Sequence, residues 1–308
     1  MQSIDVLMDH ILDYAGLFPP AKLDMEPTVR NYATYRESAE RWMLARLIVP
    51  VARLEEFETS AQDLLPTPKD PASDDCWLIS ALTAPAGEDG FAADLEKIEQ
   101  FNEKHAAPGA GAALIDTIEC RAADASAIDT ALDRLPESIF PYFELDHHVD
   151  VRGMAAAIAG MDAGAKIRSG GVTPDLHPTP EELAKFIIAC AGAEIPFKAT
   201  AGLHHPLRHH SEIVGCDQFG FLNVFIGACI AWTYELDVET LLPILEVRSI
   251  EAFVLEDSML GFGEHMLNLD QVAEARERFC HGFGSCSFEE PLDDLVGLHL
   301  LRRDAAQA

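Results

Sequence analysis

The feature of this chain that most constrains its fold is a regular alternation of short apolar, β-branched segments with longer segments of helical periodicity. Eight apolar segments are predicted to be strands, at residues 13–18, 45–49, 77–82, 112–118, 140–145, 165–168, 196–200 and 279–285. Helical patterns lie between them, at residues 29–41, 54–65, 91–105, 123–135, 152–161 and 180–191. Alternation with this period favours parallel strands that are covered by their connecting helices.

The number of these units predicts a closed barrel. The chain has 308 residues, and a barrel of eight β/α units commonly takes roughly 250. We therefore predict an α/β fold, with a single (β/α)8 TIM-barrel domain over residues 1–308. An open doubly wound sheet is the alternative, but no G-x-G-x-x-G segment follows the first predicted strand. Residues 251–269 alternate apolar and polar side chains around Asp257 and Ser258, which predicts a small β-hairpin insertion near the C-terminus.

Two further segments have clear local signals. Thr179 followed by Pro180 and then Glu182 combines an N-cap, a proline in the first turn and a capping-box glutamate, which predicts a helix start. The long loop before it lies where a barrel keeps its active-site loops. The apolar residues 219–232 carry Asn223 and are too short to span a bilayer, so we predict a buried helix there.

Two lysines stand out because each lies inside a predicted strand, shortly before a glycine-containing turn. They are Lys166 and Lys198. Neighbouring strands lie about 4.8 Å apart, so the two ammonium groups should share one cavity. Each positive charge would lower the pKa of the other, and a lysine with a lowered pKa is a nucleophile at neutral pH. The structural alternative is a buried ion-pair network in which Glu144 neutralises a lysine.

Alternation of side chains along three consecutive strands gathers further polar groups in the same cavity. If Lys166 points inward, so does Arg168, and on the next strand Lys198 and Thr200 point inward together. On the preceding strand the same alternation points Glu144 inward, which makes it the favoured proton shuttle.

The two lysine segments resemble a known family. They are Lys166-Ile167-Arg168-Ser169-Gly170-Gly171 and Lys198-Ala199-Thr200-Ala201-Gly202-Leu203. They resemble the lysine motifs of strands six and seven in class I (Schiff-base) aldolases of the deoxyribose-phosphate aldolase type. The resemblance implies that Lys166 forms the Schiff base and that Lys198 lowers its pKa. It also implies that the three glycines lie near an anionic end of the substrate. It is limited to these segments, and Arg168 and Ala201 depart from the family's pattern.

We therefore predict a lyase that cleaves or forms a carbon–carbon bond through a lysine imine on a small carbonyl or sugar-phosphate substrate. The predicted catalytic residues are Lys166, Lys198 and Glu144. The predicted substrate-binding residues are Arg168, Ser169, Gly170, Gly171, Thr200, Gly202, His204, His205, Ser285 and Ser287. Chemistry of this kind needs neither a metal nor another cofactor.

Histidines at predicted strand ends provide an alternative. Glu144, His148 and His204 could together hold a divalent metal such as zinc or manganese, although their spacing matches no short metal motif. The protein would then be a metal-dependent lyase, isomerase or hydrolase. A third alternative is a non-catalytic barrel that binds a small anionic or carbonyl compound.

Three other segments leave two interpretations open. Ser285 and Ser287 precede a helical pattern, so they could bind an anion or form a turn and an N-cap. Cys286 between them could be a nucleophile, but no particular histidine is indicated as its base. Asp13 and Tyr14 could transfer protons at the mouth of the barrel or could pack in its core.

Composition excludes several partners. The chain has 52 Asp and Glu against 22 Lys and Arg, a formal net charge of −30, and such a surface repels nucleic acids. We predict no transmembrane helix and no secretion signal, and therefore a cytoplasmic protein. The seven widely spaced cysteines predict reduced thiols. Barrels of this size often pair through their outer helices, so the sequence leaves a monomer and a homo-oligomer as alternatives.

The acidic excess also resembles that of proteins from salt-loving organisms, in which salt screens the repulsion between like charges. We therefore expect the melting temperature to rise with KCl concentration, measured by a thermal melt at fixed pH. A melting temperature that stays constant or falls as KCl is added would contradict this interpretation.

Overall fold

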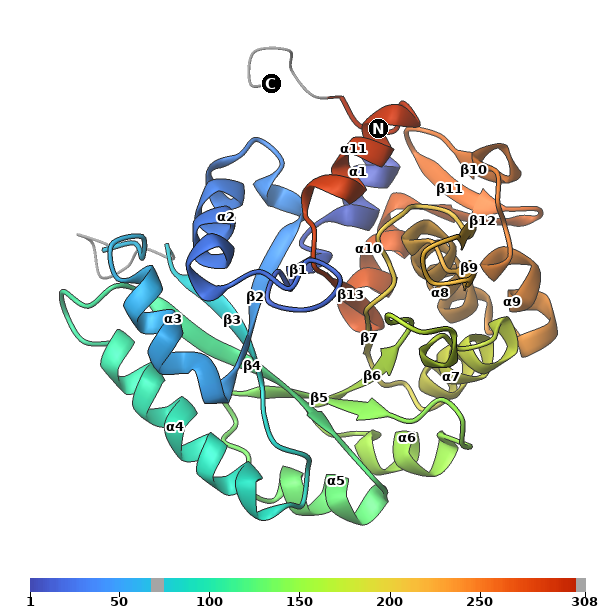
Figure 1. Ribbon diagram of the computed structural model, residues 1–308. Coiled ribbons are helices and arrows are strands. Elements are labelled where there is room, and N and C mark those ends of the chain that lie inside the picture. The colour runs from blue at the N-terminus through green and yellow to red at the C-terminus, as the bar shows by residue number, and fades with distance from the viewer. Residues whose placement is uncertain (68–74, 303–308) are drawn as a thin grey trace.

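Eight parallel strands form a closed barrel, which confirms the predicted fold class (Figure 1). The computed structural model describes residues 1–67 and 75–302. Around the barrel the strand order is β1-β13-β7-β6-β5-β4-β3-β2. The strands are β1 (Leu12–Tyr14), β2 (Leu44–Pro50), β3 (Trp77–Leu82), β4 (Ala113–Arg121), β5 (Phe140–Leu145), β6 (Gly164–Arg168), β7 (Phe197–Thr200) and β13 (Cys280–Ser285).

Helices surround the barrel because each parallel strand must be connected to the next by a crossover. They are α1 (Gln2–Met8), α2 (Met25–Glu37), α3 (Leu54–Ala61), α4 (Asp89–His105), α5 (Ala125–Leu132), α6 (Arg152–Ile158), α7 (Pro180–Gly192), α8 (Phe221–Tyr234), α9 (Val238–Leu245), α10 (Leu269–Arg278) and α11 (Glu289–Gly297). In Figure 1 most of these helices form a ring outside the strands. The predicted helices differ from these mainly at their ends.

The apolar core lies between the strands and the helices. Phe197 on β7 is fully buried and contacts Phe186, Phe225 and Phe279 from three different helix-layer segments. Helix α8 is buried along most of its length, as predicted for residues 219–232. Its polar core residue, Asn223, accepts a hydrogen bond from the backbone of the preceding loop and donates one to the Ile244 carbonyl in α9 and one to the Val247 carbonyl just after α9.

Helix α7 begins at the predicted capping box. The Thr179 hydroxyl accepts a hydrogen bond from the Glu182 backbone N–H at 3.2 Å, and the Glu182 carboxylate accepts one from the Thr179 backbone N–H at 2.7 Å. Both bonds satisfy amides that have no partner inside the helix.

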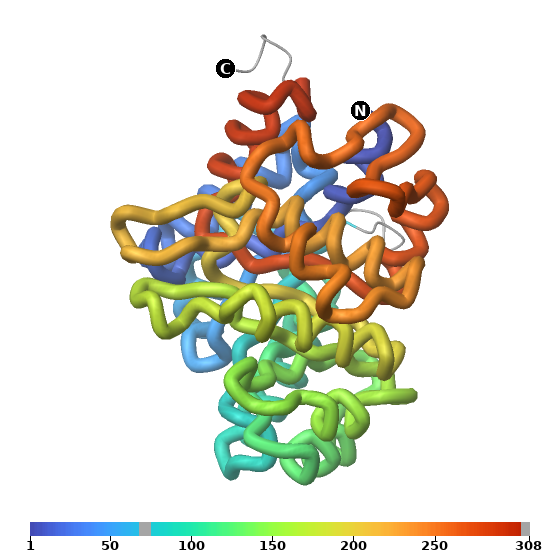
Figure 2. Tube along the Cα trace, turned by 90° about the vertical axis from the view of Figure 1, so that its right-hand side faces the viewer, coloured from blue at the N-terminus to red at the C-terminus, as the bar shows by residue number. Residues whose placement is uncertain are grey.

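The predicted hairpin insertion contains one more strand than expected. Residues 253–268 form an antiparallel three-stranded sheet of β10 (Phe253–Leu255), β11 (Met259–Phe262) and β12 (His265–Asn268). Gly263 supplies the second turn with a φ of 59°. The sheet lies beside α1, where the Ser3 hydroxyl donates to the Glu256 carbonyl at 2.5 Å (Figure 2).

A second hairpin was not predicted. Strands β8 (His209–Ser211) and β9 (Cys216–Gln218) pair in the segment between β7 and α8. Most of their side chains are polar, so the sequence there lacks the alternation of apolar and polar residues that marks a half-buried strand.

Within the described part of the chain, no helix combines the length and apolarity needed to cross a membrane. All seven cysteines fall within the described residues and are free thiols.

Candidate active site

A cavity of about 470 Å³ opens at the carboxyl ends of the barrel strands. This is the end at which TIM barrels carry their active sites. Its polar lining is formed by Thr83, Glu119, Arg121, Glu144, Lys166, Arg168, Thr200, His204 and Cys286. Apolar side chains such as Phe18, Ile48, Leu82 and Leu176 complete the wall. The cavity therefore combines apolar walls with charged groups, as small-molecule sites commonly do.

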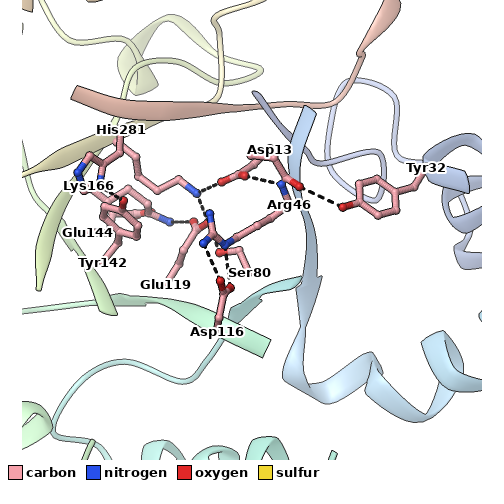
Figure 3. Close-up of polar contacts among 12 residues, drawn as sticks. Asp13, Tyr32, Arg46, Ser80, Asp116, Glu119, Tyr142, Glu144, Lys166 and His281 are labelled. Carbon is pink, nitrogen blue, oxygen red and sulfur yellow. Dashed lines mark hydrogen bonds and ion pairs between the residues drawn. The ribbon is translucent and has the colours of Figure 1, made fainter. Parts of the chain in front are cut away.

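Glu119, which lines this cavity, joins the two lysines. One carboxylate oxygen accepts a hydrogen bond from the Lys166 ammonium at 2.7 Å, and the other accepts one from Lys198 at 2.7 Å. The Ser80 hydroxyl donates to the same oxygen as Lys198, at 2.8 Å. Figure 3 shows Glu119 and Ser80 among the polar residues inside the barrel. All three charged side chains are at least 95% buried.

Lys166 and Lys198 lie opposite each other on β6 and β7, as predicted, but they differ in environment. Lys166 lines the cavity and also contacts Glu144 at 2.8 Å. Lys198 lies deeper and donates to Asp13 of β1, with its nitrogen 5.4 Å from the centre of the Tyr142 ring. Lys166 is therefore the ammonium group that a bound molecule can reach.

Glu144 lies at the boundary between the buried network and solvent. One of its oxygens contacts Lys166, and the other lies 3.3 Å from the Arg121 guanidinium and 3.8 Å from that of Arg168. Its side chain is 12% exposed. Glu144 is thus the carboxylate best placed to exchange protons with a ligand.

The expectation that Lys198 leaves Lys166 with a lowered pKa is wrong. Burial acts to lower the pKa of Lys166, but the charges of Glu119 and Glu144 outweigh it and raise the pKa above the ordinary value of 10.5. Burial likewise opposes the charges of Asp13 and Glu119 at Lys198, whose pKa is also raised. Both lysines are therefore ammonium ions in the resting protein, because three carboxylates surround two amines.

The carboxylates shift in the opposite direction. Burial acts to raise the pKa of Glu119, but the charges of Lys166 and Lys198 hold it well below its usual range. Burial also acts to raise the pKa of Glu144, and Lys166 and the nearby arginines lower it instead. Raised lysine pKa values and lowered glutamate pKa values are typical of a buried ion-pair network. Such a network is the structural alternative named in the sequence analysis.

These pKa shifts predict how stability depends on pH. The contribution of Glu119 and Glu144 is present above their unfolded pKa of about 4.5 and is lost as pH falls through their lower folded values. The contribution of Lys166 and Lys198 is present below about pH 10.5 and is lost as pH rises through their higher folded values. We expect a plateau of the urea midpoint between about pH 5 and pH 10. A steep fall of the midpoint between pH 6 and pH 9 would contradict this network.

Some of the predicted substrate-binding residues line the cavity, and others pack inside the protein. Arg168, Gly171, Thr200 and His204 line the cavity. Ser169 is fully buried and its hydroxyl donates to the backbone of β7 and the following residue. These contacts hold the end of β6 against the end of β7.

Two of the predicted glycines allow that close approach. A side chain at Gly202 would place its Cβ 2.9 Å from the Cα of Gly170, and Gly202 has a φ of +77°. Both features require glycine there. Gly170 and Gly202 therefore shape the rim by packing against each other.

Three further predicted residues lie in other roles. His205 contacts Asp294 at 2.6 Å, and its side chain is 45% exposed. Ser285 and Ser287 serve the turn into α11, because the Ser285 hydroxyl accepts from the Ser287 backbone and the Ser287 hydroxyl accepts from the Glu290 backbone. The turn-and-cap interpretation of this segment fits these bonds.

The alternative metal set is not brought together. Glu144 and His204 line the cavity, whereas His148 lies against Glu182 on the outer side of the barrel mouth, beside α7. A different group forms there: ligand atoms of His147, His148 and Glu182 all lie within 4.8 Å of one another.

Glu119 is the residue that the sequence analysis missed. The predicted strand ended at residue 118, but β4 continues to Arg121. The signal that could have found it is alternation, since Thr117, Glu119 and Arg121 follow one another at every second position. Asp13, considered only for proton transfer or packing, supplies the third carboxylate of the network.

Comparison with known proteins adds a structural similarity alone. No protein-family model and no curated protein matches the chain. Among solved structures, the chain is similar to a citrate lyase beta subunit from M. tuberculosis, complexed there with oxaloacetate and magnesium. The sequence identity is 11% and the TM-score is 0.39, over 78% of this chain and 97% of that chain. At this level the similarity carries no information about the chemistry of the site.

Proposed function

We propose that this barrel is a lyase that cleaves or forms a carbon–carbon bond in a small anionic carbonyl compound, through an imine on Lys166. One observation carries the proposal. Lys166 lines the cavity with its nitrogen between two carboxylates, at 2.7 Å from Glu119 and 2.8 Å from Glu144. A single amine presented to a cavity among proton acceptors is the arrangement that imine chemistry requires.

The network that raises the pKa of Lys166 also favours the intermediate. A protonated imine has its positive charge on the same nitrogen as the resting ammonium ion. Glu119 and Glu144 therefore stabilise the charge of both species, and they need no reorganisation between them. The protonated imine then accepts the electron pair of the carbon–carbon bond that breaks.

Glu144 completes the proton balance. It takes a proton from the Lys166 ammonium, and the free amine adds to the carbonyl carbon. A proton passes from the nitrogen to the carbonyl oxygen, which becomes a hydroxyl group. Glu144 then returns the proton to the hydroxyl group of the adduct, which leaves as water. The products are the protonated imine, water and an ionised Glu144, so no further reactant is needed. The 12% exposure of the Glu144 side chain gives it access to this cycle.

The charges around the mouth indicate an anionic substrate. Arg121 and Arg168 line the cavity, and both lie near the outer oxygen of Glu144. Each guanidinium can hold a carboxylate or phosphate with two hydrogen bonds. The cavity volume of about 470 Å³ favours a compound of metabolite size.

Borohydride trapping tests this proposal without a known substrate. The protein is incubated with a panel of small aldehydes, ketones, keto acids and sugar phosphates, reduced with borohydride and weighed intact. We expect a mass increase of one reduced adduct with at least one anionic carbonyl compound. Borohydride alone and each compound alone are the controls. A panel that yields no adduct would contradict the proposal.

A metal-dependent lyase, isomerase or hydrolase is the second candidate, favoured by the grouping of His147, His148 and Glu182. Zinc and manganese bind such imidazole and carboxylate ligands. This candidate predicts an activity that is lost to a chelator and restored by the metal, together with an absence of borohydride adducts. The imine proposal predicts adduct formation that a chelator leaves unchanged.

A further inference from the structure

A second group of reactive side chains lines the same cavity. Cys286 and His204 both belong to the lining, with the Cys286 sulfur 3.9 Å from Nε2 of His204. Nδ1 of the same ring lies 2.9 Å from a carboxylate oxygen of Glu290. The three side chains therefore form a chain of thiol, imidazole and carboxylate, in the order of a nucleophile, its base and the group that orients the base.

The fold positions each member of this chain. Cys286 directly follows β13, Glu290 lies in the first turn of α11, and His204 follows the Gly202 turn after β7. Since β7 and β13 are neighbours in the barrel, these segments meet at its mouth. The His204 side chain is only 14% exposed, which limits its movement.

The hydrogen bonds select the tautomer that a base needs. A carboxylate at Nδ1 favours the ring with its proton on that nitrogen, which donates to Glu290. Nε2 then has a free electron pair that faces the Cys286 sulfur. Burial raises the pKa of the Cys286 thiol, so it is neutral in the resting protein. A neutral thiol needs a base at the moment of attack, and His204 is in place to be that base.

We propose that Cys286 is a second nucleophile of this cavity, with His204 as its base and Glu290 as the positioning residue, and that it adds reversibly to small aldehydes. The sulfur forms a bond to the aldehyde carbon while its proton passes to Nε2 of His204. The carbon–oxygen double bond becomes a single bond, and the imidazolium returns the proton to that oxygen. The product is a thiohemiacetal, and no other reactant is needed.

The choice of an aldehyde rests on the proposed function, whereas the reactivity of the thiol does not. Cleavage of a carbon–carbon bond next to a Lys166 imine leaves one fragment on the lysine and releases the other as a carbonyl compound. A thiol that lines the same cavity can hold an aldehyde fragment until it leaves or reacts in the reverse direction.

Alkylation with iodoacetamide tests the thiol without any substrate. Peptide mapping gives the rate at each cysteine, and half-exposed Cys76 and Cys216 serve as internal references. We expect His204→Gln to slow alkylation of Cys286 at least tenfold relative to these references, and Glu290→Gln to slow it severalfold. His205→Gln is the matched control, because His205 contacts Asp294 instead. It should leave the rate unchanged.

Aldehyde binding is tested in a Lys166→Met variant, in which no imine can form at residue 166. Glyceraldehyde and glycolaldehyde are expected to protect Cys286 from iodoacetamide in this variant as well as in the wild-type protein. If His204→Gln and His205→Gln give the same Cys286 rate, the thiol proposal is wrong. If the alkylation results hold but neither aldehyde protects, Cys286 is reactive and its assignment to aldehydes is overturned. The alkylation experiment does not depend on Lys166. If borohydride trapping at Lys166 fails while the alkylation results hold, only the proposed function is contradicted.

Discussion

Replacing Glu119 with glutamine is expected to lower the free energy of unfolding by about 3–5 kcal/mol, because it removes one partner of two buried ion pairs. Lys166 and Lys198 would each lose a carboxylate at 2.7 Å, and both are almost completely buried. Glutamine preserves the size of the side chain, so the loss of unfolding free energy measures the effect of removing the negative charge. Urea unfolding at pH 7 measures the effect, with the slope of the transition as a check on two-state behaviour.

Two control variants make this result specific. Glu274→Gln removes an exposed ion pair with Arg278 and should cost only about 0–1 kcal/mol. The double variant Glu119→Gln with Lys198→Met should recover part of the loss, because it also removes the buried Lys198 ammonium that has lost its Glu119 partner. A Glu119→Gln loss below about 1 kcal/mol would show that the network is solvated, contrary to the structure.

The second large effect concerns the two lysines, which the structure assigns different roles. Lys166→Met removes the cavity-lining amine, so we expect no borohydride adduct and a fall in kcat/KM of at least about 1,000-fold on any substrate that the panel identifies. Lys198→Met keeps that amine but removes the second cation from Glu119. Glu119 then pairs with Lys166 alone and raises the pKa of Lys166 further. Because less of Lys166 is then a free amine, borohydride trapping at pH 7 should slow by roughly tenfold.

Intact mass after borohydride distinguishes the two variants, and a thermal melt confirms that each is folded. Lys185→Met is the matched control, since Lys185 is exposed on α7 and pairs with Glu181 at 2.7 Å. A Lys166→Met protein that still forms the adduct would refute the assigned role. A Lys198→Met protein that loses the adduct entirely, while remaining folded, would exchange the roles of the two lysines.

The barrel could be predicted from the sequence because its signals are local. An apolar strand, a turn and an amphipathic helix each span few residues, and the Thr179 capping box lies within four. The polar residues 209–218 have no such signal, so their hairpin was missed. The turn between β11 and β12 contains Gly263. One glycine in the sequence does not indicate whether the insertion forms two strands or three.

The site was predictable only in part, because its contacts join distant segments. Alternation placed Glu144 and the two lysines on the inner face of three consecutive strands, but Glu119 lies 47 residues from Lys166 and 79 from Lys198. No spacing rule connects such positions. The same holds for Cys286 and His204, which are 82 residues apart. The error in the lysine pKa followed directly, since counting two amines without the carboxylates of Glu119 and Asp13 reverses the sign of the shift.

The most direct test of the imine proposal is to locate the reduced adduct by peptide mapping. Reductive alkylation prevents trypsin from cleaving at the modified lysine, so an adduct on Lys166 should appear in an uncut peptide of residues 153–168. An adduct on Lys198 would instead appear in an uncut peptide of residues 186–208. We predict the first peptide, in wild-type protein and with an anionic carbonyl compound. An adduct confined to the second peptide or to exposed lysines such as Lys185 would contradict the account.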